Sequence, residues 1–291
     1  MTATAPAAAI PLRPAATVML LRDGTQGLEV FMLKRHDRSD VHGGVFVFPG
    51  GKVDAADAQL DAAAHLDSTP AQLFDSLGDA SLSTQQALAF HVSALRELFE
   101  ECGVLLTADT SDALSAQAAA TLQGGLTFNE MLRQHGLRLS TANLQIHSRW
   151  ITPVMTMTGK RFDTHFFAAL LPEGVSPRHD NHEAVESVWL TPRKALQMYW
   201  QGEMLLAPPQ IMSLANLARY VSAADVLADA RRRTPPVILP EVSGGDADRI
   251  VAFPGDERHS ISAAVIPGPT RLAFRGGRFE PVDGLDALLP A

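Results

Sequence analysis

The sequence predicts an α/β protein that carries a β-rich C-terminal extension. Strand-like segments alternate with capped helices from residue 15 to about residue 231, and short apolar runs between prolines and glycines follow to residue 291. The first 14 residues are small, contain prolines and lack periodicity, so we expect a disordered tail there. The expected organisation is a tail over residues 1–14, a main domain over residues 15–231 and an extension over residues 232–291.

The elements follow in order from turn and cap signals. Strands are expected at residues 16–21, 28–33, 46–48, 144–152, 161–171 and 185–190, the first two joined as a hairpin at Asp23-Gly24. Helices are expected at residues 84–102, 111–122 and 127–135, from residue 191, and from residue 208 to about residue 230. Small hairpins are expected in the extension, from strands at residues 237–239, 249–253, 262–266 and 270–274.

The helix over residues 84–102 carries the most informative residues. Ser83 and Gln86 form a capping box at its start, and a glycine stands just past its end. Its last turn gathers Glu97, Glu100 and Glu101, at spacings that place like charges about 5–6 Å apart. A charge run is more often a solvated helix face than a site. Hard oxygen ligands clustered in this way nevertheless suit Mg²⁺ or Mn²⁺, which take further ligands from substrate phosphates.

An upstream turn changes the balance in favour of a site. The apolar segment 46–48 runs into Pro49-Gly50-Gly51, where glycine lets the backbone approach a metal or a phosphate closely. Together the two segments resemble the box of the Nudix hydrolases. Gly51 matches the first glycine of that box, and its second half is matched without exception by Arg96, Glu97, Leu98, Glu100, Glu101, Gly103 and Val104.

The box departs from the family pattern in two ways. Asp57 stands where the family has glutamate, and 38 residues rather than seven separate Asp57 from Arg96. This split box resembles the subgroup that includes the peroxisomal-type coenzyme A diphosphatases. The resemblance implies an α/β/α sandwich with a mixed central sheet and a helical insertion at about residues 58–83. We expect the insertion to lie beside the active-site mouth as a lid, because its two ends must return to the site.

The resemblance also implies roles for individual residues. Divalent metal, Mg²⁺ or Mn²⁺, is expected on Glu97, Glu100, Glu101 and the carbonyl of Gly51. Arg96 is expected to orient a ligand carboxylate, and Asp57 either completes that layer or caps the loop. A further carboxylate, the general base in many members, is expected from the loop at residues 179–186, with Glu183 as the choice and Glu186 as the reserve.

Substrate contacts are expected from glycines and basic residues. Gly50 and Gly51 belong to the turn, and Arg35 and Arg38 lie in a polar loop near it, where a solvated loop and a phosphate contact are equally good interpretations. Arg161, together with its neighbour Lys160, stands at a strand start, where it could grip a diphosphate or face solvent.

Composition excludes several classes of function. The net charge of −8 argues against nonspecific binding of nucleic acid. No apolar run reaches the roughly 18 residues of a membrane helix, and the alanine-rich start lacks the basic region of a signal peptide, so we expect a cytoplasmic protein without a membrane partner. The extension is expected to pack on the domain or on a partner subunit, which leaves a homodimer open.

The predicted activity is metal-dependent hydrolysis of the pyrophosphate bond in a nucleoside diphosphate linked to another moiety. Coenzyme A or an acyl-CoA is the substrate that the resemblance favours, with ADP-ribose, nucleotide sugars and dinucleoside polyphosphates as alternatives. A catalytically silent Nudix-fold module that binds a ligand is the alternative from a different class. The repulsive cluster of Glu97, Glu100 and Glu101 argues against that module, because mere binding has no need of it.

Overall fold

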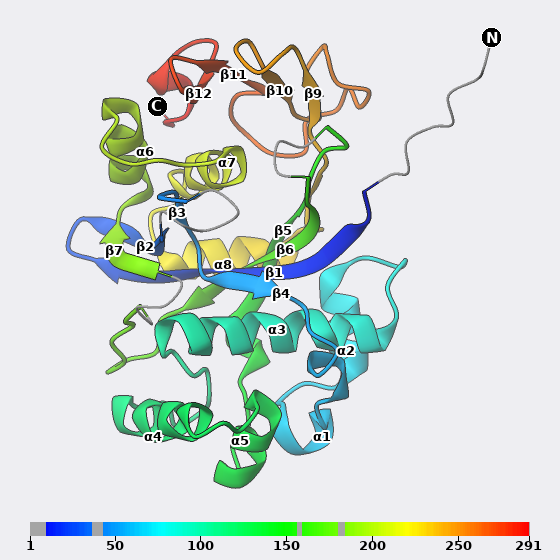
Figure 1. The fold of residues 1–291 in the computed structure, drawn as a ribbon, viewed down its shortest axis with the longest axis vertical. Helices are drawn as coiled ribbons and strands as arrows, with labels where there is room; N and C mark the ends of the chain where they lie inside the picture. Colours follow the sequence, from blue (N-terminus) through cyan, green and yellow to red (C-terminus); the bar gives the residue numbers. More distant parts are fainter. Residues whose placement is uncertain (1–9, 37–42, 156–158, 180–183, 291) are drawn as a thin grey trace.

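A mixed central sheet of eight strands organises the protein (Figure 1). The computed structural model describes residues 10–36, 43–155, 159–179 and 184–290. The strands run β3-β2-β1-β6-β5-β8 across the sheet, while β4 pairs with β1 and β7 pairs with β2. Their bounds are β1 Leu12–Gly24, β2 Gly27–Arg35, β3 Phe46–Val47, β4 Gly50–Lys52, β5 Leu144–Ile151, β6 Arg161–Leu170, β7 Ala184–Leu190 and β8 Val237–Ile238.

Both faces of this sheet are buried, as the side chains of β1 show. Successive residues of a strand point to opposite faces. Val18 and Leu20 accordingly belong to one hydrophobic core, and Met19 and Leu21 belong to the other. The strand is therefore apolar along most of its length, which is typical of a sheet that is covered on both sides.

Helices cover the two faces and complete the expected α/β/α sandwich (Figure 1). The first core is closed by α1 Ala62–His65, α2 Pro70–Leu77, α3 Thr84–Cys102, α4 Asp112–Gln123 and α5 Phe128–His135, with short 3₁₀ turns at Asp57–Gln59 and Thr141–Asn143. The second core is closed by α6 Pro192–Gln201, α7 Pro208–Leu217 and α8 Ala223–Arg232. Helix α3 has the predicted bounds and the predicted capping box of Ser83 and Gln86.

A second, antiparallel sheet forms the C-terminal region, next to α6 and α7 at the top of Figure 1. Its strands are β9 Glu241–Ser243, β10 Ile250–Ala252, β11 Arg271–Arg275 and β12 Arg278–Pro281, followed by a 3₁₀ turn at Leu285–Ala287. The Tyr199 hydroxyl of α6 donates to the Phe279 carbonyl at 2.7 Å and accepts from the Phe279 amide at 2.9 Å. The extension therefore packs on its own domain.

Several predicted boundaries were wrong. The first strand begins at Leu12, within the expected tail, because its first residues pair in parallel with β6 from Arg161 onward. The single helix predicted from residue 208 to 230 is two helices, since Ser222 begins a new capping box with Asp225. The segment 262–266 forms no strand, and the strand β9 was not predicted.

The predicted lid is also contradicted. The insertion packs away from the cleft, where its Leu66 forms a β-bridge with Leu139 and the His65 ring contacts the Leu137 carbonyl at 2.8 Å. Asp79, near its end, forms an ion pair with Arg149 of β5 at 2.5 Å. The two ends of the insertion do return to the β4 turn and to α3, but the apolar residues between them pack in the buried surface beside α5.

None of the helices that the structure describes has the length and apolar character needed to span a membrane.

Three of the buried histidines predict acid lability. Burial lowers the pKa of His91, His147 and His165 to about 4, against about 6.5 in an unfolded chain. Below pH 6.5 these histidines are protonated in the unfolded chain but remain neutral in the folded chain, so folding stability is lost as the pH falls from 6.5 towards 4. We expect each histidine to contribute on the order of 3 kcal/mol to that loss.

His165 offers the cleanest test of this expectation. Neither of its ring nitrogens has a hydrogen-bond partner among the described residues, and the ring stacks on Phe90 with centroids 3.9 Å apart. The variant His165→Phe should therefore lose less unfolding free energy than the unsubstituted protein between pH 6.5 and pH 4, as measured by urea unfolding. An identical loss in both proteins would contradict the assignment of a buried neutral imidazole.

Candidate active site

The Gly50-Gly51 turn lies against the acidic end of α3. The Gly50 amide donates to Oε2 of Glu101 at 2.8 Å. A Cβ atom at Gly51 would stand 2.5 Å from Oε1 of Glu97, so only glycine leaves room for that carboxylate. A Cβ atom at Gly50 would collide with the carbonyl oxygen of Ala16. Both glycines are therefore needed for close approach between the turn and the helix.

Arg96 is the centre of the ion-pair network at this junction. Its guanidinium binds Asp57 through two hydrogen bonds, of 2.9 and 3.0 Å, and donates to the Lys52 carbonyl at 2.9 Å. It also donates to Glu97 at 2.8 Å and to Glu100 at 3.0 Å. Arg96 thus ties the β4 turn, the root of the insertion and two of the three clustered carboxylates together.

Asp57 both holds Arg96 and caps the loop. The Asp57 residue is 1% exposed, and its Oδ2 accepts the Asp54 amide at 2.8 Å. A bidentate pair with Arg96 leaves its carboxylate directed at the arginine rather than at the cleft. The split box is therefore closed in space by this ion pair, although the insertion separates its halves in the sequence.

Burial and charge act against each other in this cluster. Burial alone would lower the pKa of Arg96, but its bonds to Asp57 and the charge of Glu97 outweigh burial and raise that pKa. Arg96 therefore stays charged at all accessible pH values. Burial raises the pKa of Glu100 above its ordinary value, and the Arg96 charge offsets only part of that effect.

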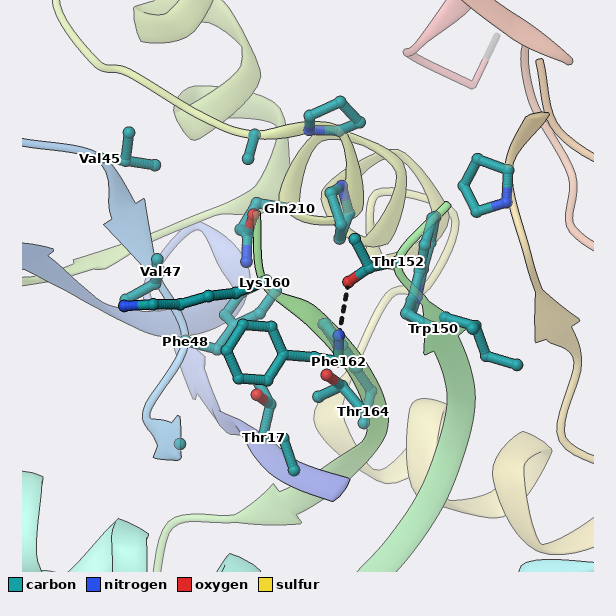
Figure 2. Close-up of a pocket in the computed structure, with 18 of the residues that line it drawn as sticks. Thr17, Val45, Val47, Phe48, Trp150, Thr152, Lys160, Phe162, Thr164 and Gln210 are labelled. Carbon is teal, nitrogen blue, oxygen red and sulfur yellow. Dashed lines mark hydrogen bonds between the residues drawn. The ribbon is translucent and has the colours of Figure 1, made fainter. Parts of the chain in front are cut away.

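A cleft of about 780 Å³ opens beside the cluster, between the central sheet and the C-terminal sheet. Glu97 and Asp54 line its acidic end, together with Gly50 and Gly51. Figure 2 shows Lys160, Phe162 and Thr164 in the middle of the cleft, where the Phe162 amide donates to the Thr152 hydroxyl at 2.9 Å. Further lining comes from Thr17, Phe48, Trp150, Phe166, Gln210, Val242, Arg249, Val251 and Phe279.

The structure distinguishes the basic residues that line the cleft from those that do not. Arg35, Lys52 and Lys160 line the same cleft as Glu97, so basic and acidic side chains share it. Arg161 was wrongly predicted to reach the substrate, because its buried guanidinium donates to the carbonyls of Thr152 and Pro153 and does not line the cleft. Its neighbours Lys160 and Phe162 line the cleft instead, because successive residues of an extended chain point to opposite sides.

Of the two candidates for the general base, only Glu186 lies in the part of the chain that the structure describes. Glu183 and Arg38 lie outside the described residues. Glu186 lies on β7, where its carboxylate pairs with Lys34 at 3.6 Å, and it is not among the cleft-lining residues. The reserve candidate is thus positioned by an exposed ion pair on the sheet edge.

The donor chemistry of the site fits a hard divalent cation. Glu97 borders a glycine cradle that any side chain at residue 51 would fill, and Glu101 accepts the neighbouring Gly50 amide. In the part of the chain that the structure describes, no three acidic, histidine or cysteine side chains are already grouped to enclose an ion. Two of the carboxylates are turned to Arg96, so binding of an ion requires side-chain rearrangement here.

Comparison with known proteins identifies the family. The model described as the NUDT19 Nudix domain matches residues 4–217, which is more than half of the chain. The chain belongs to the Nudix hydrolases. It is therefore a pyrophosphohydrolase by family. The predicted resemblance of the split box to the coenzyme A diphosphatase subgroup is thereby confirmed.

Two curated relatives and one solved structure illustrate the similarity of this Nudix hydrolase to other members. It is 30% identical over 276 residues to the human acyl-coenzyme A diphosphatase NUDT19, covering 80% of this chain and 72% of that protein. The Gallus gallus protein of the same name is 28% identical over 281 residues, covering 79% and 72%. A crystal structure of a Nudix hydrolase from Alicyclobacillus acidocaldarius has a TM-score of 0.62 and 27% identity, and the match covers 76% of this chain and 97% of that one.

The cradle at Gly51 predicts the effect of a single methyl group. Gly51→Ala would press its Cβ against Glu97, and the flexible carboxylate would move while the backbone stays in place. We expect turnover to fall at least about tenfold and the melting temperature to change little, because a misplaced active-site group costs much more in rate than in stability. Gly124→Ala, at the end of α4 with φ of −72°, is a matched control that should retain full turnover. Full turnover of Gly51→Ala would show that catalysis does not depend on the present position of the Glu97 carboxylate.

Proposed function

We propose that this Nudix hydrolase cleaves the pyrophosphate bond of coenzyme A and its acyl esters with the aid of Mg²⁺ or Mn²⁺. The observation that carries the proposal is the meeting of Glu97 with Arg35, Lys52 and Lys160 in one cleft. A diphosphate needs cations around its oxygens, and the acidic cluster needs a counter-charge. The names of the human and Gallus gallus relatives, which are acyl-coenzyme A diphosphatases, support this choice of substrate.

The metal would be held by Glu97, Glu100, Glu101 and the Gly51 carbonyl. When bound, a divalent ion neutralises phosphate charge and favours ionisation of the attacking water. Nudix hydrolases generally use such ions, and the oxygen donors of this cluster suit Mg²⁺ and Mn²⁺ alike.

The chain's own residues orient the reacting groups. The Gly50 amide holds Glu101, and Arg96 holds Glu97 and Glu100, so the three carboxylates are kept near the turn, from which a short side-chain rearrangement would bring them onto an ion. Arg35, Lys52 and Lys160 bind phosphate oxygens along the cleft. Ring and methyl groups from Phe162, Thr164 and neighbouring residues exclude water around the diphosphate.

We propose Glu183 as the general base. It precedes β7 in the sequence, whereas Glu186 inside β7 pairs with Lys34 outside the cleft. Glu183→Gln is therefore expected to lower kcat more than Glu186→Gln, because the Glu186 carboxylate is held outside the cleft by Lys34. Steady-state kinetics of both variants with the same substrate check this order. The reverse order would transfer the role to Glu186.

A substrate panel tests the proposed function directly. Chromatographic detection of products should show that coenzyme A and acyl-CoA are split into an adenosine bisphosphate and a phosphopantetheine, in the presence of Mg²⁺ or Mn²⁺ and not of chelator. ADP-ribose, a nucleotide sugar and a dinucleoside polyphosphate serve as competing substrates. A higher kcat/KM for any of these than for both coenzyme A compounds would refute the substrate assignment.

A further inference from the structure

The cleft has a second end, which the catalytic residues do not use. One end holds the Gly50-Gly51 turn and Glu97. The far end is lined by the C-terminal region, with Pro240, Val242, Arg249, Val251 and Phe279. All five residues lie beyond residue 217, where the match to the family model stops. This wall is therefore built by a part of the chain outside the residues that the family model matches.

The C-terminal wall is apolar. Val242 of β9 pairs with Val251 of β10, and the Phe279 ring contacts Phe274 with centroids 5.1 Å apart. The charge of Arg249 is matched by Asp246, to which it donates at 2.6 Å. Opposite this wall, the central sheet lines the cleft with the rings of Trp150, Phe162 and Phe166. Apolar groups on both sides favour an apolar ligand between them.

The wall is also pre-formed. The two hydrogen bonds between Tyr199 and Phe279 fasten β12 to α6. Trp150 packs edge-on against Phe253 with ring centroids 6.0 Å apart, which fastens β5 to the segment after β10. Val251 is 5% exposed and belongs to the second hydrophobic core. A wall that is already ordered adds affinity without the entropic cost of arranging itself around a ligand.

We infer that the C-terminal sheet forms the subsite for the acyl chain of a fatty acyl thioester of coenzyme A. The inference rests on the proposed function, because it takes the diphosphate to lie at the Glu97 end. Of the remaining substrate groups, the acyl chain is the one without polar atoms, and it matches the apolar wall of Val242, Val251 and Phe279. A cleft of about 780 Å³ is within the size of pockets that bury most of a ligand.

Chain length provides the first measurement. Each methylene seated against the wall is expected to raise kcat/KM up to about fourfold, until the wall is covered. The kcat/KM values of acetyl-CoA, hexanoyl-CoA and decanoyl-CoA should therefore rise in that order. Val242→Asp places a charge on the wall, and Val242→Trp fills the space in front of it. Both variants should lower the decanoyl-to-acetyl ratio of kcat/KM at least about tenfold.

Val282→Asp is the matched control. Val282 belongs to the same C-terminal region, is 53% exposed and does not line the cleft, so this variant should keep the ratio of the unsubstituted protein. Thermal unfolding establishes that all three variants are folded. An unchanged ratio in both folded Val242 variants would overturn the inference, and hydrolysis of coenzyme A by the same proteins would show that the proposed function still holds.

Binding separates the two proposals completely. If the unsubstituted protein hydrolyses none of these thioesters, the proposed function fails. Calorimetry with decanoyl-CoA and free coenzyme A then still measures whether the C-terminal wall binds the acyl chain, since binding requires no turnover. Tighter binding of decanoyl-CoA that is lost in Val242→Asp would support the subsite, and equal affinities for the two compounds would overturn it.

Discussion

Replacing Glu101 by glutamine is expected to lower turnover by about 10²–10³-fold while the protein stays folded. Glu101 is 8% exposed, and its carboxylate accepts the Gly50 amide at 2.8 Å. A glutamine oxygen can accept the same hydrogen bond, so the turn is retained. The charge that would hold a divalent ion is lost. Stability should be equal or slightly higher, because repulsion from neighbouring carboxylates falls.

The measurement is kcat across a titration of Mg²⁺ and of Mn²⁺, with thermal unfolding of each protein. Glu97→Gln should behave in the same way, since Glu97 lines the cleft beside Gly51. Glu173→Gln is the matched control, because Glu173 is an exposed loop carboxylate that does not line the cleft. Near-normal turnover of both active-site variants at saturating metal would remove these carboxylates from the metal site.

Replacing Arg96 by methionine is expected to have the largest effect on stability. Asp57 is 1% exposed, and in this variant it would lose both guanidinium bonds while remaining buried. Breaking a buried ion pair by removing one partner typically costs about 3–5 kcal/mol, since the other charge is left uncompensated. Turnover should fall as well, because Glu97 and Glu100 lose the group that orients them.

A double variant separates these two effects. Arg96→Met with Asp57→Asn removes the stranded charge, and the asparagine oxygen can still accept the Asp54 amide. The double variant should be more stable than Arg96→Met alone in urea unfolding, whereas its turnover should stay low. Recovery of turnover in the double variant would mean that Arg96 acts only on stability and has no part in orienting Glu97 and Glu100.

Local signals were sufficient for the helix and the turn that build the site. Ser83, Gln86 and Gly103 define α3 through hydrogen bonds within a few residues, so its bounds could be predicted. Gly50 and Gly51 could be recognised as a close-approach turn for the same reason. The apolar run of β1 before the Asp23-Gly24 turn likewise predicted a strand, although its start at Leu12 depends on pairing with β6, about 150 residues away in the sequence.

The position of the insertion and the composition of the cleft could not be predicted in this way. The ends of the insertion had to return to the site, but where its middle packs depends on buried partners such as Leu139, which no local pattern reveals. Arg161 was predicted as a substrate contact because the residues at the start of a strand do not show which face of the sheet each side chain will occupy. Only the packing of its guanidinium on the Thr152 and Pro153 carbonyls decides the face.

The sequence by itself determined the family, the acidic cluster and its helix, because these depend on residue types at short, fixed spacings. The tertiary structure decided that Asp57 closes the split box through Arg96, and that the C-terminal sheet rather than the insertion walls the cleft. Both outcomes depend on contacts between segments that are far apart in the chain. Such contacts are selected by the burial of complementary surfaces, which is a property of the whole fold and not of any one segment.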